Sequence, residues 1–494
     1  MKIRKLVIIP MVLVLVLMTG ISAMATDNLP YDTYNYDYWG YVYNTPAAYV
    51  YSDAVTGLTI KREDGTALGA FKTPQDMCVS EDGKVYIADT GNNRIIVTDL
   101  KFNLLEEITE YVEGEEKKTF NQPYGVFVSQ ANILYIADKG NGRVVGLTPE
   151  RTVHKIIQNP KSEEIEEKFA PVKVAVDYAD RAFVISAGSF QGIMAFDEKG
   201  DFTGFTGNIP VSLSVMEKFW RIFSTKAQRS RGELYISTEF TGLDIDKDGF
   251  VYATYYDANG TQAIRRLNPK GEDVIKKSKR LSVPDRLAGD LFYRAAGNGN
   301  FSGPSRMIDI VYRGRGVYSV MDFNRGRIFT YDHEGNILYI FGGMGTQDGT
   351  FASPVALDVI GENIVTLDSK TNSIQVFDET RYGNLINQAV YLRYDGDEKK
   401  AVEMWKEVLA LDSNFELAYV GIGKSLLAAG ENEKAMKYFK IGMDREYYSI
   451  AYKRYRNDML KDNLGYVLTV LVTIIVGYVS FKKYRKIKAG REED

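Results

Sequence analysis

A short segment recurs six times along this chain of 494 residues, and it constrains the fold more than any other feature of the sequence. The first two copies read YIADTGNNRI and YIADKGNGRV and lie 49 positions apart. Each copy follows a short apolar run such as QDMCVS, and a polar turn with a further apolar run, such as DHEGNILYIF, comes after it. The copies occupy residues 84–99, 133–148, 181–197, 250–268, 317–332 and 362–378.

Each repeat unit thus contains four short strands with turn residues at fixed offsets, which is the pattern of β-propeller blades. The Pro-x-x-Val/Ala strand, the Val-Tyr-Ile-Ala-Asp strand and the Gly-Asn-x-Arg-Ile turn resemble the NHL repeat over residues 47–380. The resemblance implies a mainly β, six-bladed propeller. It is weaker in the third unit, where Ala187 takes the Asp position, and in the fourth, which is one residue longer around Asp257. We expect residues 48–63 to add a strand to the last blade and close the ring, which removes exposed sheet edges.

The shared Asp-x-Gly-Asn-x-Arg stretch has two interpretations, a catalytic or metal-binding loop and a structural turn. Gly and Asn supply the backbone angles that a tight turn needs, so the turn is the favoured interpretation. Acidic and basic residues at its two ends are predicted to pair across the loop, namely Asp89 with Arg94, Asp138 with Arg143, and Asp322 with Arg327. As loops on one face of the ring, these residues are also candidates for the border of a binding site.

Two insertions interrupt the repeat period, at residues 208–232 and 271–300. Each joins the outer strand of one blade to the inner strand of the next, so propeller geometry predicts that both rise on the face that carries the Asp-x-Gly-Asn-x-Arg loops. The first reads as a helix. Basic residues gather in both insertions and form a candidate binding face, of which the alternative interpretation is a solvated helix and loop: Arg221, Lys226, Arg229 and Arg231 in the first, and Lys276, Lys277 and Arg280 in the second.

Helical periodicity replaces the strand pattern after residue 380. Gly396, Ala401 and Trp405 recur 34 positions later as Gly430, Ala435 and Phe439. A period of 34 residues is that of tetratricopeptide repeats, in which small residues lie where helices cross and an aromatic fills the gap. We therefore expect a tetratricopeptide-like, all-α segment over residues 381–460.

The two ends of the chain predict a single-pass membrane protein. Residues 1–25 read as a signal peptide cleaved after Ala25, because a basic start and a short apolar run precede Ala-Met-Ala. Residues 464–481 carry no charge and are long enough to span a membrane. The basic tail, residues 482–494, then belongs in the cytoplasm and the body outside it.

Enzymatic chemistry has few candidate residues. His154 and His333 are the only histidines and Cys78 is the only cysteine, so no zinc constellation can be assembled from them. Asp244, Asp246 and Asp248 resemble half of a calcium loop, but the twelfth position is Tyr255 rather than Glu. Inner-strand carboxylates could line the channel as in calcium-dependent lactonases of the gluconolactonase type, though no spacing singles out a set: Asp76, Asp244, Asp309 and Asp358. No cofactor or metal is expected.

The sequence therefore favours a membrane-anchored extracytoplasmic binding or scaffold protein that recognises a protein or glycan partner through one face of the propeller, as an accessory of an envelope or transport assembly. A net charge of −4 gives no reason to expect nucleic acid. The alternative is a lactonase-like hydrolase or lyase with its site in the channel. The Tyr-rich segment at residues 26–46 either anchors a partner or packs along the outside of the ring.

Overall fold

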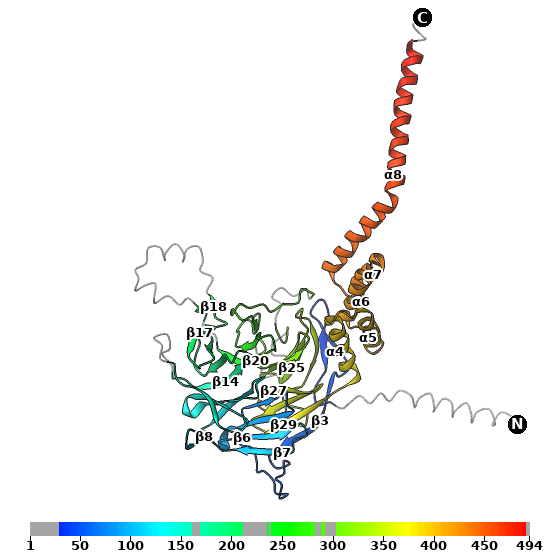
Figure 1. Ribbon diagram of the computed structural model, residues 1–494. Helices are drawn as coiled ribbons and strands as arrows, with labels where there is room; N and C mark the ends of the chain where they lie inside the picture. Colours follow the sequence, from blue (N-terminus) through cyan, green and yellow to red (C-terminus); the bar gives the residue numbers. More distant parts are fainter. Residues whose placement is uncertain are drawn as a thin grey trace, which may run out of the picture. The chain divides into compact units, whose positions relative to one another are not determined.

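The computed structural model describes the chain except for its extreme ends and several internal gaps (Figure 1). The described residues are 29–160, 168–210, 235–236, 239–280, 282, 288–291 and 303–490. The predicted signal peptide lies outside them, as do Arg221, Lys226, Arg229 and Arg231 of the first insertion. Two compact units are separated after Asn384, and each is considered by itself.

The first unit is a six-bladed β-propeller, as the repeats predict. Within each blade, neighbouring strands are antiparallel, and the strand nearest the axis comes first in sequence in each repeat unit. The first three blades comprise β4 (Asp76–Val79), β5 (Lys84–Asp89), β6 (Arg94–Asp99) and β7 (Leu104–Ile108); β10 (Pro123–Val128), β11 (Leu134–Asp138), β12 (Arg143–Leu147) and β13 (Val153–Ile157); and β14 (Pro171–Val176), β15 (Ala182–Ser186), β16 (Ile193–Phe196) and β17 (Phe202–Thr206).

The other blades depart from this plan. Blade four has three strands in the described residues, β20 (Phe240–Ile245), β21 (Val251–Tyr255) and β22 (Ile264–Leu267). Blade five is a six-stranded sheet that comprises β23 (Met307–Gly314), β24 (Val317–Asp322), β25 (Arg327–Tyr331) and β26 (Ile337–Phe341), with β1 (Tyr34–Tyr36) and β2 (Val42–Asn44) added at its outer edge. The Tyr-rich segment thus packs along the outside of the ring, one of its two expected roles.

An N-terminal strand closes the ring, as predicted. Blade six comprises β27 (Pro354–Ile360), β28 (Asn363–Asp368) and β29 (Ser373–Glu379), and its outer strand is β3 (Tyr49–Thr56). The pairing runs from Thr56 opposite Ser373 to Tyr49 opposite Glu379. Inner strands pack on one another in sequence around the axis, and β27 packs on β4 to complete the circle.

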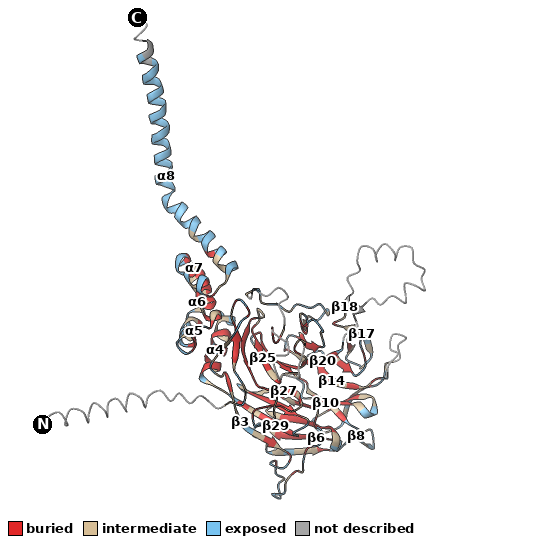
Figure 2. Cartoon of the chain, turned by 180° about the vertical axis from the view of Figure 1, so that it is seen from behind, coloured by how far each residue is buried: buried red, intermediate tan, exposed pale blue. Residues whose placement is uncertain are grey.

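Alternation along the second strand of each blade explains why the repeat reads Val-Tyr-Ile-Ala with no polar residue. In β5, Val85 and Ile87 pack in a cluster with Val365 of blade six. Tyr86 and Ala88 point to the other side and pack in a cluster with Ile136 of blade two. A strand between two blades is apolar on both faces because successive side chains alternate. Figure 2 shows the resulting buried residues running along the blade strands.

Shorter elements link the blades. A two-stranded hairpin, β8 (Glu110–Glu113) with β9 (Glu116–Thr119), separates the first and second blades. Strand β18 (Ile209–Pro210), at the start of the first insertion, pairs with β19 (Tyr235–Ile236), which follows the end of the insertion. The 3-10 turns η1 (Thr90–Asn92) and η2 (Lys139–Asn141) form the loops of the first two repeat motifs.

The second unit is helical in its described residues. Helix α4 (Arg381–Tyr394) begins in the last residues of the first unit and continues into the second, whose other helices are α5 (Glu398–Leu411), α6 (Glu416–Ala428), α7 (Asn432–Ile441) and α8 (Arg445–Gly490). Glycines of α6 receive the aromatic residues of the 34-residue repeat. A Cβ on Gly421 would lie 2.4 Å from Trp405, and a Cβ on Gly423 would lie 2.7 Å from Phe439. The helices therefore cross where the sequence places small residues.

The last helix is long and apolar enough to span a membrane by length and composition. This one continuous α-helix contains the expected span, residues 464–481, and the end of the expected tetratricopeptide-like segment, residues 381–460. Figure 2 shows most of its length as exposed, whereas Ala451 in its first turns is buried.

Candidate functional site

The six inner strands enclose a channel with a cavity of about 640 Å³. One register position contributes a residue from each blade, in the order Asp76, Gly125, Lys173, Gly242, Asp309 and Ala356. Charged residues thus come from alternate blades and small residues from those between them. A Cβ on Gly125 would lie 2.5 Å from the Val172 carbonyl oxygen, so this glycine permits the close approach of two inner strands.

Lys173 joins the charged residues of this layer. Its Nζ lies 2.6 Å from Asp76 Oδ1 and 3.0 Å from Asp309 Oδ1, and all three side chains are buried. An ammonium and two carboxylates in a low-dielectric interior are stable only when paired and hydrogen-bonded. The lysine therefore ties together three blades that share no strand pairing.

The channel carboxylates also bond to the backbone of the neighbouring blade. Asp244 accepts the N–H of Tyr312, Asp309 that of Leu357, and Asp358 that of Val79. Asp76 likewise accepts the N–H of Val126. The four carboxylates connect consecutive inner strands around most of the ring, so each holds a structural position.

Burial changes the pKa values of these groups. It raises the pKa of Asp244 to about 7, partly offset by hydrogen bonds from the N–H groups of Tyr312 and Ile245. Burial also raises the pKa of Asp358 well above its ordinary value, and the carboxylate of Asp244 adds to the effect. In contrast, the two carboxylates raise the pKa of Lys173 and keep it charged, against the effect of burial.

These residues do not fit a calcium site. Lys173 Nζ already lies between Asp76 and Asp309, where a cation would need both carboxylates. Within the described ranges, no group of three or more His, Cys, Asp or Glu side chains is placed to hold a metal ion. The supposed calcium loop is a hairpin turn, since Asp246 Oδ1 accepts the N–H groups of Asp248 and Phe250.

We expect the free energy of unfolding to fall by about 3 kcal/mol as pH rises from about 5 to about 8 because of Asp244. Its pKa is higher in the folded state than the ordinary 3.8, so the folded chain binds more protons than the unfolded chain until pH passes about 7. Denaturant titrations at several pH values measure the slope. The carboxylate of Asp309 raises the pKa of Asp244 further and the ammonium of Lys173 lowers it, and Asp358, whose pKa is also raised, acts on stability in the same direction.

The Asp244→Asn variant should flatten this profile. Asp82→Asn is the matched control, because Asp82 lies in a turn at the end of another inner strand and its pKa is lowered. A slope that Asp244→Asn leaves unchanged would show that Asp244 is ionised throughout this pH range.

The repeat-motif loops join the second and third strands of each blade. They therefore lie at the opposite end of the blade from the turns that join the first and second strands. Asp89 Oδ1 accepts the N–H of Lys72 at 2.7 Å, and its Oδ2 pairs with Arg94 Nε at 2.7 Å. Asp138 accepts the N–H of Asn121 at 2.8 Å, and Arg143 Nε lies 2.9 Å from it. Both aspartates are completely buried. These aspartates connect the loop to the segment that precedes the inner strand of the same blade. Their role is therefore structural.

The predicted pair of Asp322 with Arg327 is wrong. Arg325 Nη1 approaches Asp322 Oδ2 at 3.6 Å, whereas Arg327 donates to the carbonyl oxygens of Asp32 and Gly342. The reason lies in the loop sequence. Arg325 stands where the first two loops have Asn92 and Asn141, whose amides donate to their aspartates.

The expectation that Ala187 takes the Asp position of the third unit is also wrong. Strand pairing places Ser186, not Ala187, opposite Pro171, as Asp138 lies opposite Pro123. The Ser186 hydroxyl accepts the N–H of Ala170 at 2.9 Å. A shorter side chain thus fulfils part of the role of the aspartate.

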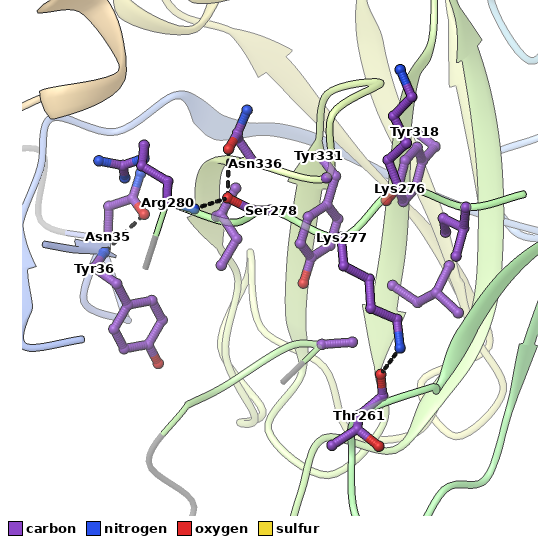
Figure 3. Close-up of a pocket in the computed structure, with 15 residues that line it drawn as sticks. Asn35, Tyr36, Thr261, Lys276, Lys277, Ser278, Arg280, Tyr318, Tyr331 and Asn336 are labelled. Atoms are coloured by element: carbon purple, nitrogen blue, oxygen red, sulfur yellow. Dashed lines mark hydrogen bonds between the residues drawn. The ribbon is translucent and has the colours of Figure 1, made fainter. Parts of the chain in front are cut away.

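The described residues of the second insertion contact blades four and five, and Figure 3 shows some of these contacts. Lys277 Nζ donates to the Thr261 carbonyl oxygen, and Ser278 Oγ lies 2.6 Å from Asn336 Oδ1. Thr261 lies in the loop between β21 and β22, on the face of the repeat-motif loops, but Asn336 lies in a turn at the opposite end of blade five. The predicted placement on one face is therefore corrected: Lys276, Lys277 and Arg280 line a small pocket at the side of the ring.

Sequence patterns missed two features of these sites. Lys173 is a charged residue in an otherwise apolar strand, PVKVAV, and this interruption is the signal that could have identified it. Asn35 and Tyr36 line the same side pocket as Lys276, and no local pattern connects segments so distant in sequence.

A comparison with protein families agrees with the repeat motif. Residues 71–97 match the NHL repeat. This NHL match covers β4, β5 and the first repeat-motif loop, and no curated protein matches the chain. Solved structures similar to it include a streptogramin B lyase, at 12% identity and a TM-score of 0.38, covering 63% of this chain and 94% of that one. Virginiamycin B lyase from Staphylococcus aureus is similar at 11% identity and a TM-score of 0.40, covering 66% and 99%. Their activity is not transferred to this chain.

Proposed function

We propose that this chain is a membrane-anchored binding protein that presents its propeller outside the cytoplasm to a protein or glycan partner. One observation carries the proposal: the channel's charged side chains bond to one another and to the blade backbone. A hydrolase or lyase needs groups directed at a substrate, and these carboxylates are directed at the strands of the ring.

The membrane attachment rests on α8 and the tail. The apolar stretch within α8 is followed by basic residues, which favour the cytoplasmic side under the positive-inside rule. A signal peptide cleaved after Ala25 gives the same orientation. The paired helices α4 to α7 form a tetratricopeptide-like segment between the propeller and the span, and such repeats offer surfaces for protein partners.

Chemical crosslinking followed by affinity capture of the full-length membrane protein tests this function. We expect a reproducible set of crosslinked partners, and we expect reversal of charge in the insertions to remove it. Two variants separate the insertions: Arg221→Glu with Arg229→Glu and Arg231→Glu, and Lys276→Glu with Lys277→Glu and Arg280→Glu.

The matched control is Lys117→Glu with Lys118→Glu, which reverses charge on the exposed β8–β9 hairpin. Capture of the same partners by all three variants would show that neither insertion is the interface. A chain that captures no partner above the background of an unrelated membrane protein would contradict the proposed function itself.

A further inference from the structure

The outer edge of blade five carries two exposed aromatic side chains on a rigid turn. Trp39 is 53% exposed and Tyr41 is 67% exposed. Asp37 Oδ1 accepts the N–H groups of Trp39 at 2.9 Å and of Tyr41 at 2.8 Å, and Gly40 has a φ of +84°. The turn is therefore held in one shape, and little conformational entropy would be lost when a ligand covers it.

The strand below this turn is anchored in the protein interior. The hydroxyl groups of Tyr34 and Tyr36 both donate to Asp290, whose other oxygen lies 3.3 Å from Arg325 Nε. The Asn35 amide donates to the carbonyl oxygen of Leu338 in β26. Exposed Trp39 and Tyr41 thus lie next to a buried, hydrogen-bonded strand.

A run of cations adjoins the turn. The backbone N–H of Ser282 donates to the Tyr38 carbonyl oxygen at 2.7 Å, which places the end of the segment KKSKR beside the aromatic turn. Lys276, Lys277 and Lys279 are exposed. Acidic residues also lie nearby: Asp37 in the aromatic turn, Asp273 three residues before the run, and Glu334 in the neighbouring turn. We call these residues the aromatic–basic surface: Trp39, Tyr41, Lys276, Lys277, Lys279 and Arg280.

A small pocket opens within this surface (Figure 3). Its volume is about 60 Å³, the space of about two water molecules. Amide and hydroxyl groups of Asn35, Ser278 and Asn336 line it together with the rings of Tyr318 and Tyr331. Most of the lining is apolar, because Ile264, Ile275 and Ile337 also contribute to it, so the pocket suits a substituent that has both an apolar and a hydrogen-bonding part, such as an acetyl group.

We propose that the aromatic–basic surface binds an anionic glycan, with the aromatic faces against sugar rings, the cations on carboxylate or phosphate groups, and a ring substituent in the pocket. The inference rests on the proposed binding function and names its ligand class. An acidic peptide would use the cations equally well, but a poly-glutamate chain has no sugar ring to lie flat on Trp39 or Tyr41 and no acetyl substituent for the pocket.

Binding of defined polymers to the full-length protein in detergent tests this. The probes are hyaluronan oligosaccharides, which combine carboxylates with N-acetylated sugars; chitohexaose, which is uncharged; and poly-glutamate of equal charge, which has no sugar. We expect hyaluronan to bind at least about tenfold more tightly than either of the others, which corresponds to about 1.4 kcal/mol.

Single substitutions assign the contacts. Trp39→Ala and Tyr41→Ala should each weaken hyaluronan binding about tenfold and leave poly-glutamate binding unchanged, whereas Lys276→Glu with Lys277→Glu should weaken both. Tyr178→Ala is the control, because Tyr178 is a 62% exposed tyrosine on another blade. Trp39→Phe should retain most of the affinity, and circular dichroism verifies that each variant is folded.

Poly-glutamate binding as tight as that of hyaluronan, or hyaluronan binding that Trp39→Ala and Tyr41→Ala leave unchanged, would overturn the glycan proposal. Continued capture of partners in the crosslinking experiment would then assign the surface to an acidic protein and leave the binding function intact. Failure of the glycan-binding test together with failure to capture any partner would contradict both this proposal and the proposed function.

Discussion

Replacing Lys173 by Met should lower the free energy of unfolding by about 3–5 kcal/mol, the largest effect we expect from a single substitution in this chain. The variant leaves Asp76 and Asp309 buried without the ammonium that lies 2.6 Å and 3.0 Å from them. Two buried carboxylates without a neutralising cation are costly, because each has lost hydration and keeps only backbone N–H donors. Chemical denaturation of the full-length protein in detergent, followed by tyrosine and tryptophan fluorescence, measures the change.

Lys247→Met is the matched control. Lys247 pairs with Glu81 at 3.1 Å across the mouth of the same channel, but both side chains are largely exposed, so its loss should cost less than about 1 kcal/mol. The triple variant Lys173→Met, Asp76→Asn, Asp309→Asn should recover much of the loss, since no buried charge is left unpaired. Equal costs for Lys173→Met and Lys247→Met would show that the cluster does not stabilise the ring.

The second large effect should come from Asp89→Ala, which we expect to cost about 3 kcal/mol. The substitution leaves the Lys72 N–H without its acceptor and removes one of the two carboxylates that hold Arg94. Because Asp89 is completely buried, water cannot replace these bonds. The same denaturation experiment measures the loss.

Asp99→Ala provides the comparison within one hairpin. Asp99 also accepts backbone N–H groups, from Lys101 and Asn103, but it lies in a surface turn where water can take its place. We expect about 1 kcal/mol or less for this variant. If Asp89→Ala lowers the free energy of unfolding no more than Asp99→Ala does, the repeat aspartate does not stabilise the loop. A functional role for the loop would then be favoured.

Local patterns predicted the architecture of the ring because every blade repeats the same short-range information. Alternation in β5, turn residues at fixed offsets and an extra strand ahead of the first unit specify six blades and the strand that closes them. The error at Asp322 was also local: Arg325 and Arg327 both lie near the aspartate, and only the fold of the loop selects between them.

The channel cluster could not be predicted in this way. Lys173 is separated from Asp76 by 97 residues and from Asp309 by 136, and they meet only because six inner strands converge on one axis. The aromatic–basic surface depends likewise on β1, whose pairing partner is β26 of the fifth blade. Spacing along the sequence contains no information about these long-range contacts, because they form only when the ring closes.

Ring closure has a consequence for biosynthesis. The two strands that complete blade six come from opposite ends of the propeller sequence; Ser52 of β3 and Val376 of β29, which bond to each other, are 324 residues apart. During translation, β3 emerges early and must remain unpaired until residues 373–379 have left the ribosome. The nascent chain therefore carries an open strand edge through most of its synthesis, and a stall or truncation before residue 373 would release a product that is prone to aggregate through that edge.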